Sequence, residues 1–307
     1  MGAARRVVLI AGPTASGKSA LALALAQRIG GVIVNTDALQ VYGVLERLSA
    51  RPSAAEMALA PHRLYGVVDP AVRFSTGDWL RAVETVIQDE APERPLIFVG
   101  GTGLYFDALL NGFAEVPQVP AEITAQVQQE IQGLDAAARG ALIAARDPEM
   151  AARLKAPDPQ RVIRALAVLQ ATGVSLARFQ DGGGAGLLNG FAVERLVLNP
   201  DREVLRGRIA TRFATMLEDG AVGEVEALLA RDLDPSLPAM KAIGVPEIRA
   251  WLAGTLPAEE AIERAVIATR QYAKRQRTWF RGRMGDWQWV DPLAHGVDGL
   301  VGMVSSS

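Results

Sequence analysis

The chain has 307 residues, half of them hydrophobic, with 32 basic and 34 acidic side chains and no cysteine. This length allows one large domain or two smaller ones, and the lack of cysteine excludes disulfides and thiolate metal sites. Only two histidines are present, and no apolar stretch reaches the roughly 18–20 residues that span a bilayer. We expect a monomer in the reducing cytoplasm, made without a signal peptide.

The first third of the sequence alternates short apolar segments with helical ones. We predict strands over residues 5–10, 32–37 and 95–101, and helices over residues 18–29, 76–90 and 104–110. Continuous apolar strands separated by helices are typical of an α/β fold whose parallel sheet is covered on both faces. Ligands of such sheets bind at the carboxyl ends of the strands. Residues 12–19, Asp37 and residues 100–102 should therefore converge on one site.

The pattern changes after Gly112, where strand signals give way to helical ones as far as about Gln180. The clearest helix is predicted over residues 159–172, between an N-capping Asp158 and Gly173. We interpret residues 116–189 as an all-helical insertion in a phosphate-loop α/β core. That core consists of residues 1–115 and 190–307, with a strand predicted over 192–199 and mostly helices over 201–283.

The segment after the first predicted strand matches the phosphate-loop pattern G-x-x-x-x-G-K-[ST]. It reads Gly12, Pro13, Thr14, Ala15, Ser16, Gly17, Lys18 and Ser19. The N–H groups of such a loop face a phosphate at a helix N-terminus, Lys18 adds a positive charge, and Ser19 can ligate Mg²⁺, the cofactor we expect. Strand 95–101 ends without the aspartate of phosphate-loop ATPases. The pattern thus favours a kinase-like transferase, or an enzyme that uses a diphosphate as leaving group.

Two residues at the other strand ends are candidates for chemistry. Asp37 can accept a proton from an attacking nucleophile, or it can be a turn or capping aspartate. Thr102 can donate to a developing oxyanion, or it can be a turn threonine. Farther along, Arg208 and Arg212 are four residues apart and share one helix face. They are candidates for a diphosphate clamp or for a solvated face.

A basic run near the C-terminus has helical spacing. Four cations, at i, i+4, i+7 and i+11, are Arg270, Lys274, Arg277 and Arg281, and three aromatics among them are Tyr272, Trp279 and Phe280. A stripe of cations with nearby aromatics is suited to an RNA backbone and to base stacking. The alternative is a solvated helix face whose aromatics belong to the core.

Five segments carry a resemblance to a known family. They are GPTASGKS (12–19), NTDALQVY (35–42), VGGTGLYFDALLNG (99–112), DPQRVIRALAVLQATG (158–173) and ATRQYAKRQRTWFR (268–281). In order and approximate spacing, the sequence resembles the tRNA dimethylallyltransferases along most of its length. The resemblance implies transfer of a dimethylallyl group from dimethylallyl diphosphate to N6 of the adenosine 3′ of the anticodon in tRNA, giving N6-isopentenyladenosine.

The resemblance also implies roles for individual residues. Asp37 would be the general base, and Thr102 would contact the reacting groups. Lys18, Arg212 and Ser19 with Mg²⁺ would stabilise the departing diphosphate. The residues implied in tRNA binding are Asp37, Ala38, Leu39, Gln40, Thr102, Thr124, Gln160, Arg161, Val162, Ile163, Arg164, Lys241, Arg270, Lys274 and Arg277.

The sequence departs from the family pattern at three places. Residues 43–53 carry Arg51 where the family usually has lysine. Val245 and Pro246 follow Ile243-Gly244, where tyrosine is usual after the glycine. Thr124 occupies a position that is often basic. These departures concern the donor pocket and tRNA affinity more than the class of reaction.

Three other functions remain open from the residues. A small-molecule kinase using ATP would explain the loop and Asp37 but not the insertion or the basic stripe. A prenyltransferase acting on free adenine nucleotides would leave the stripe unused as well. A nucleotide-gated RNA-binding module would use the stripe and give Asp37 and Thr102 no task.

Overall fold

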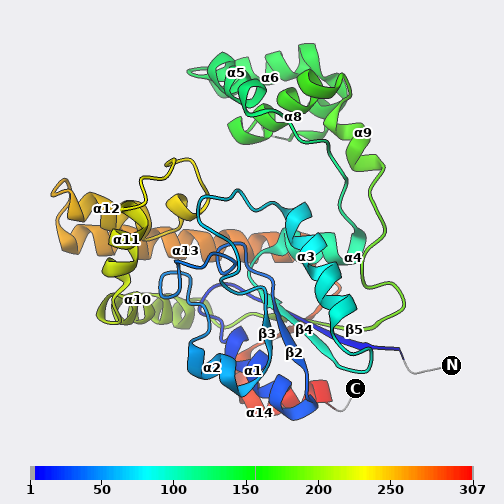
Figure 1. Cartoon of the computed structure of the whole chain (residues 1–307), viewed down its shortest axis with the longest axis vertical. Helices are drawn as coiled ribbons and strands as arrows, with labels where there is room; N and C mark the ends of the chain where they lie inside the picture. Colours follow the sequence, from blue (N-terminus) through cyan, green and yellow to red (C-terminus); the bar gives the residue numbers. More distant parts are fainter. Residues whose placement is uncertain (1–3, 156, 306–307) are drawn as a thin grey trace. The chain divides into compact units, whose positions relative to one another are not determined.

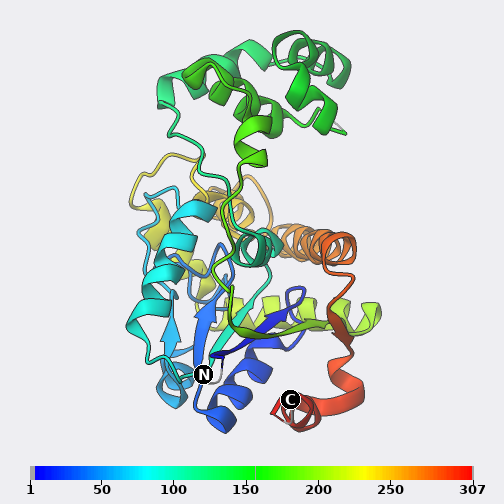
Figure 2. The same ribbon diagram turned by 90° about the vertical axis from the view of Figure 1, so that its right-hand side faces the viewer.

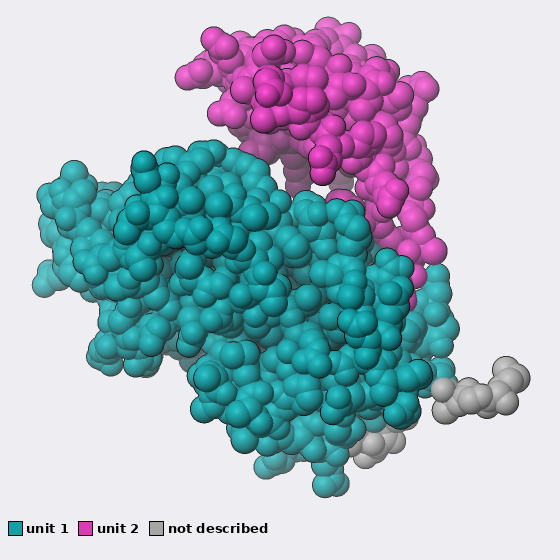
Figure 3. Space-filling view, viewed as in Figure 1, with its two compact units in different colours: residues 1–108, 188–307 teal, residues 109–187 magenta. Residues whose placement is uncertain are grey.

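The structure is a computed structural model that describes residues 4–155 and 157–305 (Figure 1). Its contacts divide the chain into two compact units (Figure 3). One contains the described residues up to 108 and from 188 onward, and the other contains residues 109–187. From the sequence the insertion was placed at 116–189. The second unit begins earlier because Gly112, with φ of 82°, lies against the Gly184 backbone, where a Cβ would collide, and because Leu187 N–H donates to Leu109 at 2.9 Å.

The larger unit is built on a six-stranded sheet in the order β3-β2-β4-β1-β5-β6. Every pairing is parallel, which confirms the predicted α/β fold class. The strands are β1 (Arg6–Ala11), β2 (Val32–Asn35), β3 (His62–Arg63), β4 (Leu96–Gly100), β5 (Ala192–Leu198) and β6 (Gln288–Val290). The sequence did not predict β3 and β6, because strands of two and three residues are too short to show a hydrophobic period.

Helices cover both faces of this sheet (Figures 1 and 2). Alternate strand residues such as Val8, Ile10 and Ile97 pack against α1 and α14, while α3 and α13 lie on the other side. The helices of the unit are α1 (Lys18–Ile29), α2 (Ala54–Leu59), α3 (Thr76–Asp89), α10 (Arg202–Glu218), α11 (Ala221–Leu229), the 3-10 turn η1 (Ala239–Lys241), α12 (Val245–Leu252), α13 (Ala258–Arg283) and α14 (Pro292–Ser305). Helix α4 (Gly103–Asn111) runs across the boundary between the units.

The smaller unit is helical and has its own apolar core. Its further helices are α5 (Ala121–Ile131), α6 (Ala136–Arg146), α7 (Pro148–Arg153), α8 (Pro159–Thr172) and α9 (Leu176–Asp181). Helix α8 has the predicted bounds, because Asp158 accepts from the N–H of Arg161 at 3.1 Å and Gly173 ends the helix with φ of 72°. Val127, Ile143 and Leu166 are among the residues of this core. In the described part of the chain, no helix is both long and apolar enough to cross a membrane.

Candidate functional site

The phosphate loop makes a tight turn between β1 and α1. Ala15 and Gly17 both have left-handed backbone, with φ of 63° and 92°, and the N–H of Ser16 donates to the carbonyl of Pro13 at 3.2 Å. Gly17 precedes α1 and offers no side-chain cap, so the N–H groups of the first turn remain available to an anion. The loop therefore has the geometry of an anion-binding site.

Two cations lie beside this loop. Lys18 Nζ donates to the Pro13 carbonyl at 3.4 Å, and Arg212 of α10 donates to the Thr14 hydroxyl. Burial lowers the pKa of Lys18 to about 8; the Asp37 charge opposes this effect, and the Arg212 charge adds to it. Burial also lowers the pKa of Arg212, again opposed by Asp37. Positive charges held so close and so poorly hydrated would be stabilised by a polyanion.

Asp37 and Thr102 are brought together by hydrogen bonds between the ends of β2 and β4. The N–H of Thr102 donates to the Thr36 carbonyl at 3.2 Å, and its hydroxyl accepts from the N–H of Ala38 at 3.0 Å. Gly100 allows this approach, because a Cβ at that position would collide with the Thr36 backbone. The two candidate residues thus share one corner of the sheet edge.

The carboxylate of Asp37 has two different surroundings. Its Oδ1 accepts from the N–H of Leu39 at 3.0 Å, as in a turn, while Oδ2 faces the backbone of Gly101. Asn35 is fully buried and brackets the Asp37 backbone, accepting from its N–H at 2.9 Å and donating to its carbonyl at 3.0 Å. Asp37 is therefore a turn residue that also presents an oxygen to the site, so the two interpretations from the sequence are compatible.

Sequence reasoning missed Gln276 of α13. Its Oε1 accepts from the N–H of Thr14 at 2.9 Å, and its Nε2 donates to the carbonyl of Gly101 at 2.9 Å. The side chain fills the space that a Cβ at residue 101 would occupy. Gln276 shares a buried face with Ala273 and Phe280, and a polar residue at a core position of an amphipathic helix was the available signal. It fastens the basic helix to the phosphate loop.

A cavity of about 310 Å³ opens beside these groups. One part of its lining is polar or charged and the other is apolar. The polar residues are Thr14, Asp37, Ser49, Arg212, Lys241, Thr269, Tyr272 and Arg275, and the apolar ones are Leu39, Leu48, Ile209, Phe213, Met216 and Ile243. Burial, with a smaller effect of Asp37, raises the pKa of Tyr272, so its phenol stays neutral. A cavity with a cationic end and an apolar wall matches a short apolar diphosphate.

The remaining predicted site residues of the larger unit differ in whether they line the cavity. Ser19 is exposed in the first turn of α1, and Lys241 is exposed and lines the cavity. Arg208 is not among the residues that line the cavity, so of the two arginines predicted as a diphosphate clamp Arg212 is the one that lines it.

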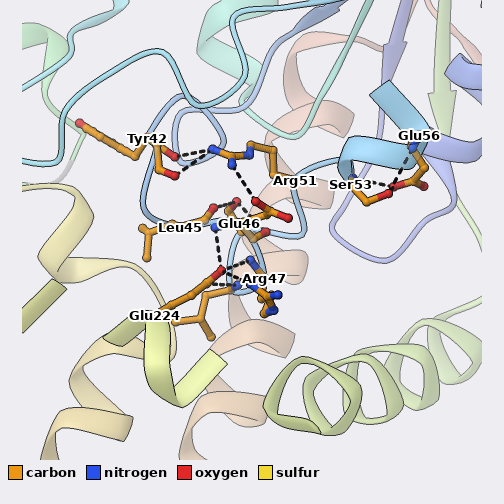
Figure 4. Close-up of polar contacts among 11 residues, drawn as sticks. Tyr42, Leu45, Glu46, Arg47, Arg51, Ser53, Glu56 and Glu224 are labelled. Atoms are coloured by element: carbon orange, nitrogen blue, oxygen red, sulfur yellow. Dashed lines mark hydrogen bonds and ion pairs between the residues drawn. The ribbon is translucent and has the colours of Figure 1, made fainter. Parts of the chain in front are cut away.

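The divergent segment 43–53 is an ordered loop (Figure 4). Arg51 donates to the carbonyls of Tyr42 and Gly43 at 3.2 and 3.1 Å and pairs with Glu46 at 3.0 Å. Its side chain is 11% exposed and does not line the cavity. Arg51 therefore stabilises its own loop.

Gln40, implied in tRNA binding, also contacts this loop. It is buried, and its Nε2 donates to the carbonyls of Ser49 and Ala50 at 2.9 and 2.8 Å. Of its neighbours, Leu39 lines the cavity, and the N–H of Ala38 is used by Thr102. The amide nitrogen of Gln40 is thus committed to the protein.

On α13 the basic stripe is accessible, whereas the aromatic residues among it differ in their exposure. Arg270, Lys274 and Arg281 are exposed, and Arg277 is half-buried. Phe280 is fully buried, and the ring of Trp279 lies against Gly103. Phe280 therefore cannot offer a stacking surface and belongs to the packing of α13, which a cation period alone does not reveal. Trp279 is partly exposed, and a role in base stacking stays a prediction.

The candidates in the insertion lie on α5 and α8. Gln160, Arg161 and Arg164 are exposed, whereas Val162 is fully buried in the core of the unit together with the partly buried Ile163. Thr124 is partly exposed on α5, and its hydroxyl donates to the carbonyl of Pro120 at 3.5 Å. The polar members of the set are thus the ones available to a ligand.

Comparison with known proteins connects this site to a family. The model of the IPP transferase family matches residues 40–283. A tRNA dimethylallyltransferase of Methylobacterium sp. (strain 4-46) is 54% identical over 296 residues, covering 95% of this chain and 96% of the relative. A relative with the same name from Allorhizobium ampelinum is 49% identical over 292 residues, covering 94% and 95%.

Solved structures agree with these relatives. The tRNA isopentenylpyrophosphate transferase of Bacillus halodurans has a TM-score of 0.69 at 28% identity, covering 98% of this chain and 96% of that one. A eukaryotic dimethylallyltransferase, whose structure was determined acting on tRNA, has a TM-score of 0.77 at 27% identity, covering 94% and 74%. On the family match and on relatives about half identical over nearly the whole length, this chain belongs to the IPP transferase family.

Proposed function

We propose that this protein is a tRNA dimethylallyltransferase. It transfers a dimethylallyl group from dimethylallyl diphosphate to N6 of the adenosine 3′ of the anticodon, giving N6-isopentenyladenosine. The observation that carries the proposal is the cavity in which Arg212 and the phosphate loop lie at one side of an apolar wall, with Asp37 also in the lining. The names of the relatives support the same reaction.

The donor would fit this cavity in one orientation. Its diphosphate would lie at the N–H groups of the first turn of α1, next to Lys18 and Arg212. Its dimethylallyl group extends along Ile209 and Phe213 of α10, which line the cavity one helical turn apart. Because Arg212 belongs to the same helix as these apolar residues, the cationic and apolar halves are held in a fixed relation.

In the reaction the lone pair of N6 attacks C1 of the dimethylallyl group. The bond from C1 to the diphosphate oxygen breaks, and the diphosphate leaves with the electron pair. Lys18 and Arg212 stabilise the charge that develops on the leaving oxygen. The amine loses a proton as the new C–N bond forms, and Asp37 Oδ2 accepts it. The Oγ of Thr102 accepts from the N–H of Ala38, and its hydroxyl is also hydrogen-bonded to the Tyr272 phenol; from this position Thr102 would contact the reacting groups.

We also propose that Mg²⁺ takes part. Mg²⁺ usually binds through one or two protein ligands together with substrate phosphates. Ser19 at the start of α1 would hold it, and it would neutralise diphosphate charge. The protein's own share of the work remains the positioning of the diphosphate by the loop.

The nucleic-acid partner in the proposal is the anticodon stem-loop of tRNA. The exposed cations Arg270, Lys274 and Arg281 on α13 would neutralise phosphates. On the insertion, Arg161 and Arg164 of α8 would do the same. The target adenosine has to leave the loop stack to reach Asp37, at a cost of a few kcal/mol. We propose a cytoplasmic monomer, and its mass by light scattering tests the monomer.

The test is incubation of the purified protein with dimethylallyl diphosphate, Mg²⁺ and an anticodon stem-loop, followed by mass spectrometry of the RNA. Replacement of one hydrogen by a dimethylallyl group on the adenosine 3′ of the anticodon is the expected product. Parallel reactions with ATP, and with free adenosine monophosphate as acceptor, test the kinase and the free-nucleotide alternatives. Phosphorylated product, or prenylated nucleotide without prenylated RNA, would replace the proposal.

A further inference from the structure

We infer that Glu224 of α11 is a positioning residue for the prenyl donor, acting through the loop that forms part of the cavity wall. This inference rests on the proposed function. Glu224 does not line the cavity, and no hydrogen bond in the described part of the chain joins it to the phosphate loop. Its carboxylate instead contacts the backbone of residues 46–48 (Figure 4).

The contact is a nest of three consecutive N–H groups around one carboxylate. Oε1 accepts from the N–H of Glu46 at 3.2 Å and of Arg47 at 2.8 Å, and Oε2 accepts from the N–H of Leu48 at 3.2 Å. The Arg47 guanidinium adds an ion pair at 3.3 Å. Successive backbone N–H groups form a concavity that binds anions, and hydrogen bonds to an ionised acceptor are the strong ones. The Glu224 side chain is only 9% exposed, so water competes weakly.

This nest matters because residues 43–50 have no helix or strand to hold them. Leu48 and Ser49 of that stretch line the cavity. Gln40 holds the far end of the stretch by its two bonds to Ser49 and Ala50, and Arg51 closes the loop on the carbonyls of Tyr42 and Gly43. Among the described residues, Glu224 of the neighbouring helix α11 is the acceptor for the N–H of Leu48, one of the apolar residues of the wall.

A glutamine at position 224 cannot replace the carboxylate. Its carbonyl oxygen can keep the bonds from residues 46 and 47, but its NH₂ group would then face the N–H of Leu48, donor against donor. The substitution leaves that N–H without an acceptor and frees the wall. The phosphate loop, on the other side of the donor, keeps all its contacts. The substitution should therefore weaken binding of the prenyl group and leave binding of the diphosphate unchanged.

Two ligands separate these contributions, and both are measured by calorimetry with Mg²⁺ and without tRNA. We expect Glu224→Gln to bind dimethylallyl diphosphate about tenfold more weakly and inorganic diphosphate within about twofold of wild type, since only the wall is disturbed. Glu226→Gln makes the same charge change at an exposed residue of the same helix and should change neither affinity. Leu48→Ala alters the wall directly, so it should reproduce the Glu224→Gln pattern.

The outcomes divide clearly. Equal losses for both ligands in Glu224→Gln would overturn the inference and indicate a general disturbance of the site, and no loss for either would assign Glu224 a role in packing alone. A Leu48→Ala variant with wild-type donor affinity would overturn it too, because the wall would then not contact the donor. If the wild-type protein binds inorganic diphosphate but gains nothing from the dimethylallyl group, the proposed function itself fails, and this inference fails with it.

Discussion

Replacement of Lys18 by methionine should inactivate the enzyme and stabilise the free protein. The substitution keeps an unbranched chain of similar length and removes the charge. Burial lowers the pKa of Lys18 from 10.5 to about 8, so the folded protein holds an ammonium that is less favourable there than in the unfolded chain. At about 1.36 kcal/mol per pH unit, the cost is at most about 3 kcal/mol. Because the residue is partly exposed, we expect a gain of about 2–3 kcal/mol in the free energy of unfolding.

The pH dependence identifies the cause of this gain. Near neutral pH, Lys18 is charged in both the folded and the unfolded protein, and the full cost applies. Between about pH 8 and pH 10.5 the folded protein carries a neutral lysine while the unfolded chain still binds the proton, so the stability of the wild type from this group rises with pH. The difference between Lys18→Met and wild type should therefore shrink over this interval.

Tryptophan fluorescence is the assay of choice for urea unfolding. The five tryptophans, at positions 79, 251, 279, 287 and 289, all lie in the larger unit, so the fluorescence signal reports unfolding of the unit that contains Lys18. A variant no more stable than wild type at neutral pH would refute the argument that the ammonium is held at a cost. A stability difference that stays constant up to pH 10 would assign the gain to packing.

Four further predictions follow from the same geometry. Asp37→Asn should lower kcat by about 10²–10⁴-fold while stem-loop affinity stays near wild type; single-turnover rates within threefold of wild type would place the base elsewhere. Replacing Lys274 and Arg277 by alanine should weaken tRNA binding and reduce the slope of log affinity against log salt by roughly one per lost phosphate contact, and an unchanged slope would leave the stripe a solvated face. Gln276→Leu should lower kcat with little change in the salt slope of tRNA binding, because it frees Thr14 and Gly101 but keeps the cations. Titration of tRNA at several salt concentrations, with the donor concentration fixed, separates the effect on binding from the effect on kcat. Inorganic diphosphate should bind the free protein more weakly as pH rises through about 8, because Lys18 loses its proton there, and the Lys18→Met variant should lack this step.

The sheet edge could be predicted from the sequence because each of its segments has a strong local signal. The apolar runs 5–10 and 95–101 and the helix 18–29 follow from composition and periodicity, and parallel strands bring their carboxyl ends together. Lys18, Asp37 and Thr102 were therefore placed correctly on the same edge. The helix 159–172 was predicted to the residue because its caps are of the strongest kinds.

What escaped prediction depends on long-range contacts. Gln276 is bonded to Thr14 and Gly101, far away in the sequence, and no local pattern records such pairs. The same applies to Glu224, because its contacts with residues 46–48 are mainly to backbone N–H groups, which no side-chain pattern reveals. Phe280 was assigned to a binding surface because only the cations of α13 were counted. The opposite face of α13 carries its own helically spaced set of buried residues, and Phe280 belongs to that set.

The most direct test of the account is a single-turnover reaction between an anticodon stem-loop, dimethylallyl diphosphate and the wild-type protein, run beside Asp37→Asn and Lys18→Met. The product is located by digestion of the RNA and mass spectrometry of its nucleosides. The account predicts N6-isopentenyladenosine at the position 3′ of the anticodon with the wild type, and a product that forms about 10²–10⁴-fold more slowly with Asp37→Asn. Absence of that nucleoside with the wild type, or its formation at equal rates by all three proteins, would contradict it.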